Sequence, residues 1–392
     1  MSAILIGLLC FIFVIWSVGS LAALFLFLLE KASQFFLAHD HLILLLPLLG
    51  LATGLSYWLV GKKFPSTKRI LLDVGGEAKS VRPFLAALFI FTFTILSQLF
   101  GASTGRESTA VQFGASVGDF WRDLFDRKLK PIRFSRQAYI RSGLAAGFGS
   151  VFGVPWAGFL FAMEVTPNRR WPLKYLPVCW LSSFGANWVA IEWGAHHKTY
   201  PIFPAIPWDA LLLAKWTCFG IAFGLLAKAF VWSMQALEKV LLRIPISWVR
   251  PVLGGIFVAT LTMWFKDTRY NGLGTQLIDM AFTQGIQDFD FLWKGIFTIL
   301  SSGSGLKGGE VTPMMAMGAS FGIVVSTYLA LPTLYGASLG LISVFAAASH
   351  IPWTGAVMAW EFFGGEAFLP TFIVCWLARK VLGLQGLFVE RH

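Results

Sequence analysis

Long apolar runs recur along the whole of this 392-residue chain, and their length limits the possible folds more than any other feature. Four of them cover residues 4–29, 42–60, 84–100 and 210–232. A helix of about twenty apolar residues crosses the hydrocarbon core of a bilayer, which is ~30 Å thick. Hydrophobic residues make up 56% of the chain and charged residues only 13%, a composition too apolar for a water-soluble globule. The sequence therefore predicts an all-α integral membrane protein.

The first run is about twice as long as the ~7–15 apolar residues of a signal peptide, and no small-residue cleavage site closes it. We therefore interpret it as a retained helix. The chain has four cysteines, all within apolar segments: Cys10, Cys179, Cys218 and Cys375. We expect them to be reduced residues that pack inside the protein, and we expect no disulfide, metal site or cofactor.

The net charge of +11 is concentrated in short connections between apolar runs. Two basic clusters lie there: Lys62, Lys63, Lys68 and Arg69 in the first, and Arg122, Arg127, Lys128, Lys130, Arg133, Arg136 and Arg141 in the second. The positive-inside rule explains both clusters and places them at the cytoplasmic face. The alternative is a patch that binds an acidic partner, and we do not expect nucleic acid.

The sequence repeats itself at an offset of about 200 residues. PWAGFLFAME (155–164) and PWTGAVMAWE (352–361) share Pro, Trp, Gly and Glu at the same four positions. The glycine-rich segments 101–116 and 303–320 also correspond, and RILLD ending at Asp73 resembles TQLID ending at Asp279. We therefore predict two membrane half-repeats, 1–200 and 201–392, with no soluble regulatory domain. Duplicated halves with interrupted apolar segments are typical of secondary transporters, whose binding sites lie near the interruptions.

Each glycine-rich segment leads into an expected helix start, at residues 105–107 and at 308–312. A helix start carries unpaired N–H groups and a partial positive charge, so it attracts an anion, and glycine lets the backbone approach that ion. Glu107 and Glu310 lie at these two starts, and acidic residues at membrane depth are functional candidates by default. A carboxylate there can compete with an anion and carry a proton. The alternative is that either carboxylate only caps its helix.

These motifs carry a family resemblance. GRESTAVQFGAS (105–116) resembles the GREGP-type motif that holds the gating glutamate of CLC anion channels and transporters, and GVPWAGFLFAME (153–164) resembles the stretch that follows it. The likeness extends from about residue 40 to the C-terminus. KGGEVTP (307–313) is similar to a segment of the fluoride-exporting bacterial branch, whereas chloride-type members have Gly-x-Phe-x-Pro. Val165 also stands where chloride/proton exchangers often have an inner proton-transfer glutamate.

The resemblance implies a fold and a set of site residues. The fold is an inverted repeat of tilted and broken transmembrane helices, and the assembly is a homodimer with one pore in each subunit. Glu107 is implied as the gating and proton-bearing glutamate, and Glu310 as a second carboxylate for gating and proton transfer. The implied anion-binding residues are Gly105, Arg106, Gly308, Gly309, Val311, Thr312, Lys68 and Phe388.

Three residues depart from the family pattern. Ser108 replaces the last glycine of the GREG motif. Lys68 or its neighbour stands where chloride members have serine and fluoride members commonly methionine, and Phe388 replaces a tyrosine whose hydroxyl contacts the central anion. We hypothesise that the Lys68 ammonium substitutes for the hydroxyl that Phe388 lacks. The alternative is that Lys68 extends to the cytoplasmic boundary beside Arg69.

Other candidates have simpler interpretations. His39, Asp40 and His41 suggest a metal clip, but we interpret them as a solvated loop between two spans. Four further carboxylates are interpreted as structural: Asp73, Asp279, Glu164 and Glu361. The sequence contains no HExxH, nucleophile elbow, Walker loop or dinucleotide fingerprint, so we do not expect an enzyme.

The resemblance implies a secondary-active anion transporter that exports fluoride in exchange for protons across a bacterial inner membrane. Two alternatives remain open, a chloride/proton exchanger and a passive anion channel without proton coupling. The implied partners are fluoride or chloride, protons, the lipid bilayer and a second copy of the chain.

Overall fold

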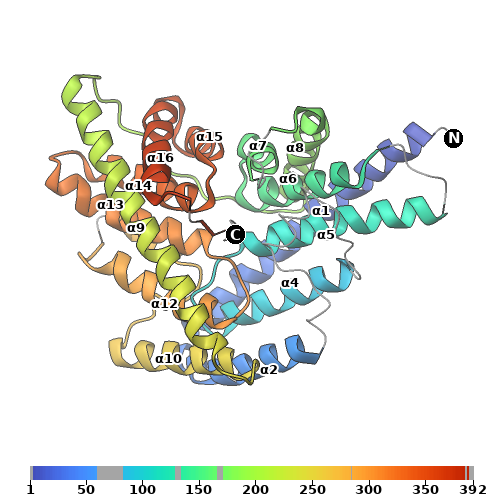
Figure 1. The fold of residues 1–392 in the computed structure, drawn as a ribbon, viewed down its shortest axis with the longest axis horizontal. Coiled ribbons are helices and arrows are strands. Elements are labelled where there is room, and N and C mark those ends of the chain that lie inside the picture. The colour runs from blue at the N-terminus through green and yellow to red at the C-terminus, as the bar shows by residue number, and fades with distance from the viewer. Residues whose placement is uncertain are drawn as a thin grey trace. The chain divides into compact units, whose positions relative to one another are not determined.

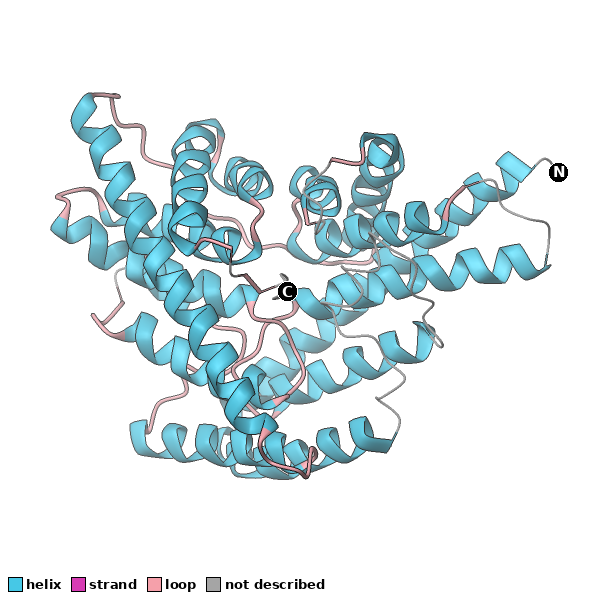
Figure 2. Cartoon of the chain, in the orientation of Figure 1, coloured by secondary structure: helices cyan, strands magenta, loops and turns pink. Residues whose placement is uncertain are grey.

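The computed structural model of the protein describes residues 3–59, 83–128, 134–165, 171–283, 285–384 and 386–387. Every regular element among these residues is a helix, joined to the next by loops and turns (Figure 2). The all-α prediction is confirmed for this part of the chain.

Some of these helices are long enough and apolar enough to cross a membrane. The candidate spans are Leu5–Ala38, Asp40–Leu59, Ala210–Leu242 and Val311–Tyr328. The first three overlap apolar runs that the sequence predicts. Other apolar helices are shorter, for example Leu85–Leu99 and Thr333–Ser349. The expectation of broken or short helices among the long ones therefore agrees with the structure.

The chain forms two compact units, and each draws on both halves of the sequence. Unit 1 takes its described residues from Met1–Lys31, Val60–Thr92 and Glu107–Lys198. Unit 2 takes its own from Ala32–Leu59, Phe93–Arg106 and Thr199–His392. The two units are defined by which residues contact one another, whereas the half-repeats 1–200 and 201–392 are defined by duplicated sequence. The half-repeats therefore stay a prediction.

Two helices pass from one unit into the other, α1 (Ala3–Ala38) and α4 (Pro83–Leu99). The remaining helices of unit 1 are α5 (Glu107–Lys128), α6 (Arg136–Phe152), α7 (Pro155–Glu164), η3 (Leu173–Tyr175) and α8 (Leu176–Glu192). Within this unit, α6 packs against α5, α7 and α8. This packing makes α6 the central helix of unit 1, and all of its residues from Ala138 to Phe152 are buried.

Unit 2 contains the other helices, labelled in Figure 1 where there is room. They are η1 (Asp40–Leu45), α2 (Leu46–Leu59), α9 (Ala210–Leu242), α10 (Val249–Phe265), α11 (Thr275–Phe282), α12 (Asp290–Ser304), α13 (Val311–Tyr328), α14 (Thr333–Ser349), α15 (Pro352–Phe363), η4 (Gly365–Ala367) and α16 (Phe368–Leu382). Helices α2 and α10 lie side by side, and α14 packs against α9, α13, α15 and α16. The central helix of this unit is therefore α14, which is buried from Tyr335 to Ser349.

Glycines bring α5 and α6 into backbone contact in unit 1. A Cβ atom on Gly114 would overlap the carbonyl oxygen of Gly143, and a Cβ on Gly143 would overlap that of Gly114. Small residues at helix crossings are typical of membrane proteins, because helices in lipid associate through close packing rather than through the hydrophobic effect.

The same arrangement occurs between α13 and α14 in unit 2. A Cβ atom on Gly318 would overlap the carbonyl oxygen of Gly340, and a Cβ on Gly340 would overlap that of Gly318. Gly322 and Gly336 are paired in the same way. Gly114 and Gly318 are the first residues of the two Gly-Ala-Ser motifs that the internal repeat predicts. The repeated motif therefore has the same packing role in each unit.

We expect Gly318→Leu to destabilise the protein, because overpacking a close crossing costs about 1–3 kcal/mol or more. The larger side chain has to push α14 away from α13. Gly365→Ala is the matched control, since a Cβ there meets nothing within 4 Å. Thermal unfolding in detergent measures both, and a Gly318→Leu midpoint equal to that of Gly365→Ala would contradict the close crossing.

The two Pro-Trp motifs also adopt one local structure. Helix α6 ends before Gly153 at φ 72°, and α14 ends before His350 at φ 60°. A left-handed residue is a common helix terminator, and proline suits the first position of the next helix. Pro155 and Pro352 accordingly begin α7 and α15.

Two sequence predictions are wrong in part. Cys10, Cys179 and Cys375 are buried free thiols, but Cys218 is exposed on α9, so it does not pack inside the protein. Arg141 is not part of an exposed basic connection, because it is 4% exposed within α6. Its guanidinium donates to the Ala162 carbonyl, 2.6 Å away, near the C-terminal end of α7, where the helix dipole favours a cation.

Candidate functional site

The two glycine-rich motifs meet in unit 2. Gly105 and Gly309 form an isolated antiparallel bridge in which each backbone N–H donates to the other residue's carbonyl oxygen. The bond from Gly309 to Gly105 is 2.8 Å long. Two segments about 200 residues apart in sequence are thereby fixed side by side.

Glycine is required at this crossing. Gly308 has φ 149°, a conformation that residues with a side chain rarely adopt. A Cβ there would also overlap the side chain of Thr104. The backbone at Gly308 therefore lies too close to Thr104 for any side chain at this position.

Three side chains hold the 101–106 segment from outside. Gln98 Nε2 donates to the Thr104 carbonyl at 2.7 Å and to its hydroxyl at 3.2 Å. Asn271 Nδ2 donates to the Gly101 carbonyl at 2.8 Å, and Ser301 Oγ accepts from the Ser103 backbone N–H at 3.0 Å. Gln98, Ser103, Thr104 and Ser301 are each at most 1% exposed, so this hydrogen bonding is shielded from solvent.

Helix α13 begins at Val311, directly after the second glycine motif. Glu310 occupies the N-cap position, but its side chain makes no capping hydrogen bond. The interpretation of Glu310 as a mere helix cap is therefore not supported. Val311 and Thr312 are buried, at 5% and 3% exposure.

Glu107 lies in unit 1, where it is the first residue of α5 and is 2% exposed. Both predicted helix starts are thus confirmed, at Glu107 and at Val311. The preceding residue, Arg106, belongs to unit 2 and lies near Tyr200 in the connection before α9. Burial raises the pKa of Tyr200 to about 12, and the positive charge of Arg106 acts in the opposite direction.

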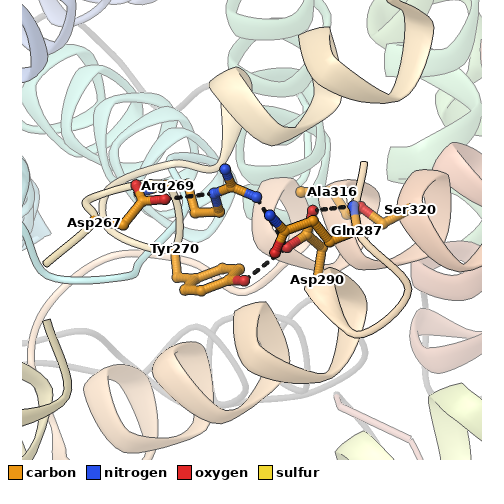
Figure 3. A network of polar contacts seen from close by, with 7 residues as sticks. All are labelled: Asp267, Arg269, Tyr270, Gln287, Asp290, Ala316 and Ser320. Atoms are coloured by element: carbon orange, nitrogen blue, oxygen red, sulfur yellow. Dashed lines mark hydrogen bonds and ion pairs between the residues drawn. The ribbon is translucent and has the colours of Figure 1, made fainter. Parts of the chain in front are cut away.

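A polar network that was not expected from the sequence links the α10–α11 connection to the start of α12 (Figure 3). The Asp290 carboxylate is fully buried and accepts from the Tyr270 hydroxyl at 2.7 Å and from the Gln287 backbone N–H at 2.8 Å. Arg269 Nη1 lies 3.5 Å from it, and Nε of the same arginine pairs with Asp267 at 2.7 Å. The network fixes the connection to the N-terminal end of α12.

Burial and the carboxylates of this network together shift the pKa values of Arg269 and Tyr270, and both groups stay hydrogen-bond donors. Burial lowers the pKa of the Arg269 guanidinium, but Asp267 and Asp290 outweigh burial and leave that pKa above its ordinary value. Burial, and then the hydrogen bond to Asp290, raise the pKa of the Tyr270 hydroxyl. Arg269 therefore stays charged, and Tyr270 stays protonated and donates.

Lys294, one turn after Asp290 on α12, is a further charged residue that was not expected from the sequence. Its side chain is fully buried, and its ammonium donates to Ser103 Oγ at 2.9 Å. It also donates to the carbonyls of Tyr270 at 3.0 Å and Gly272 at 2.9 Å. The only signal in the sequence is a lysine within an otherwise apolar stretch, where a charge is costly and calls for an explanation.

A family model described as voltage gated chloride channel matches residues 58–383, well over half of the sequence. The chain belongs to the CLC family. This membership confirms the family resemblance of the GRE and Pro-Trp motifs.

Two relatives show the range within the CLC family. The chain is 35% identical over 378 residues to a chloride/fluoride channel protein of Pseudomonas syringae pv. tomato, covering 94% of this chain and 82% of the relative. It is 31% identical over 304 residues to the H+/Cl− exchange transporter ClcA of Vibrio parahaemolyticus, covering 73% of this chain and 64% of the relative.

Solved CLC structures share the fold. A CLC-type fluoride/proton antiporter superposes with a TM-score of 0.89 at 28% identity, covering 98% of this chain and 96% of the other. A slow cyanobacterial Cl−/H+ antiporter superposes with a TM-score of 0.80 at 19% identity, covering 96% and 94%, and this second likeness concerns the fold alone.

In this CLC protein, the predicted site residues fall into three groups. The first group lies in unit 2 and consists of Gly105, Arg106, Gly308, Gly309, Glu310, Val311 and Thr312. Glu107 is described within unit 1. The third group, Lys68 and Phe388, lies outside the described residues, so the hypothesis that one substitutes for the other stays a prediction.

Proposed function

We propose that this CLC protein is a proton-coupled anion antiporter that exports fluoride. The observation that carries the proposal is the bridge between Gly105 and Gly309, which joins the two glycine-rich motifs next to Glu310 and the start of α13. Similarity to a protein named for chloride and fluoride and to a fluoride/proton antiporter supports the choice of fluoride.

The start of α13 has donors suited to a small anion. The first N–H groups of a helix have no intrahelical acceptor and carry a partial positive charge. Pro313 supplies no N–H, so the backbone donors of this turn come from Val311 and Thr312. Fluoride is a compact and strong hydrogen-bond acceptor, and a buried site with two backbone donors compensates for part of its lost hydration.

Glu107 and Glu310 provide the proton chemistry in this proposal. A carboxylate at the start of α5 occupies the position that an anion would otherwise favour. Protonation removes its negative charge and releases the carboxyl group from the helix start. Glu107 therefore alternates between competing with the anion and carrying a proton, and Glu310 is the second carboxylate on the route.

The main alternative within the CLC family is a chloride/proton exchanger, which the 31% identity to a H+/Cl− exchange transporter favours. Glu310 argues for fluoride. A fixed carboxylate next to the anion path repels any anion while ionised, but when protonated it donates a hydrogen bond, which fluoride accepts more strongly than chloride does.

Anion flux from liposomes tests the choice. Purified protein is reconstituted into vesicles loaded with fluoride or with chloride, and an anion-selective electrode follows efflux, with protein-free vesicles as the control. We expect fluoride efflux to exceed chloride efflux and to drive proton uptake. Equal or greater chloride efflux rejects the fluoride assignment, and anion efflux without proton movement indicates a passive channel.

We also propose a bacterial inner-membrane location, in line with the bacterial relatives. The homodimer that the family resemblance implies stays a proposal. The basic residues between α5 and α6 then face the cytoplasm, as the positive-inside rule requires. Labelling of single cysteines introduced at Arg127 from either side of intact vesicles tests this orientation.

A further inference from the structure

Lys294 is a basic side chain buried inside the protein, and membership of the CLC family does not by itself explain its burial. Its side chain is fully buried in unit 2, on α12. A charged side chain inside a membrane protein is costly unless a carboxylate, a set of dipoles or a bound ion compensates it. The burial of this ammonium therefore requires compensating partners in the structure.

No carboxylate among the described residues lies within ion-pair distance of the Lys294 ammonium. Asp290, one turn earlier on α12, directs its oxygens to Tyr270, Gln287 and Arg269 instead. The ammonium is bonded only to neutral oxygens, those of Ser103, Tyr270 and Gly272, with the Asn271 carbonyl farther away at 3.5 Å. Neutral oxygens, rather than a carboxylate, therefore satisfy the hydrogen-bond donors of Lys294.

The hydrogen bonds of Lys294 lead directly to the crossing of the two glycine motifs. Ser103 Oγ, which accepts from the ammonium, also lies 2.9 Å from the hydroxyl of Thr298. The backbone N–H of the same serine donates to Ser301. Three residues of α12, Lys294, Thr298 and Ser301, therefore bind Ser103. Ser103 is two residues before Gly105, the residue that pairs with Gly309.

The other bonds of Lys294 fix the connection between α10 and α11. The ammonium donates to the carbonyl oxygens of Tyr270 and Gly272. The stem of the lysine packs against Gly274, where a Cβ would come within 2.6 Å of the Lys294 Cε atom. Asn271 in turn donates to Gly101. Lys294 is therefore the common point that ties this connection to the 101–106 segment.

We propose that Lys294 is a positioning residue for the anion path. It holds Ser103, and through Ser103 it holds Gly105 against Gly309. The inference rests on the proposal that the Gly105–Gly309 crossing borders the anion path, but it does not depend on which anion is carried.

Anion flux at a series of fluoride concentrations tests this role, with Lys294→Met in liposomes. Methionine keeps most of the apolar stem and removes the charge and its hydrogen bonds. A lost bond to a charged group corresponds to about tenfold or more in an equilibrium constant, so we expect the KM for fluoride to rise by about tenfold. Lys239→Met, an exposed change on α9 with the same loss of charge, is the matched control and is expected to leave the KM unchanged.

The concentration series separates positioning from a purely structural role. A structural defect reduces the fraction of active protein, which lowers the maximal rate and leaves the KM of the remainder unchanged. An unaltered KM in Lys294→Met therefore overturns the proposal.

Ser103→Ala is the second variant, for the case in which Lys294→Met does not fold. It removes one small hydroxyl and keeps the lysine, and we expect a KM increase of several-fold. A wild-type KM in Ser103→Ala likewise overturns the positioning role. If the wild-type protein moves chloride and not fluoride, the fluoride assignment fails, and the same variants are then judged by the KM for chloride.

Discussion

Glu107→Gln is expected to abolish proton movement driven by an anion gradient while anions continue to pass. The amide has nearly the shape of a protonated carboxyl group, but it neither releases a proton nor carries a negative charge. Without that charge, nothing at the start of α5 competes with the anion. Proton uptake should fall to the level of protein-free liposomes, measured with a pH electrode alongside the anion electrode.

Glu192→Gln is the control for this change. Glu192 is the exposed last residue of α8 in the same unit, so the variant makes the same chemical replacement away from the helix start. It should retain wild-type coupling. Full coupling in Glu107→Gln would remove this residue from the proposed mechanism.

Gly308→Ala should lower anion flux by on the order of 100-fold, because displacements of about 1 Å at a binding site have effects of this size. The new Cβ overlaps Thr104, and a residue with a side chain at φ 149° is strained. The bridge between Gly105 and Gly309 then has to open. Initial fluoride efflux per reconstituted protein measures the effect.

A second substitution distinguishes the two causes. Thr104→Gly combined with Gly308→Ala removes the overlap with the Thr104 side chain. It leaves the strained φ, and it leaves the Gly105 carbonyl oxygen 2.9 Å from the new Cβ, so we expect flux to recover only in part. Gly365→Ala, where a Cβ has no neighbour within 4 Å, is the neutral control. Wild-type flux in Gly308→Ala alone would contradict a functional role for the crossing.

Local features of the sequence were enough to predict the two helix starts. A glycine-rich stretch followed by residues that form helices predicts where a helix begins, and α5 and α13 begin at Glu107 and Val311 as expected. Reasoning from local sequence failed for Arg141 and Cys218, because the exposure of a residue depends on which other helices cover it.

Short segments of the sequence were enough to predict that this chain lies in lipid. They also predicted where two of its helices begin and which glycines recur in the repeated motifs. These properties depend on residues a few positions apart, so they can be read along the chain. The pairing of Gly105 with Gly309 and the burial of Lys294 were decided by the tertiary structure. A buried donor or charge needs acceptors, and those of Lys294 come from residues 103, 270 and 272, which only the fold brings together.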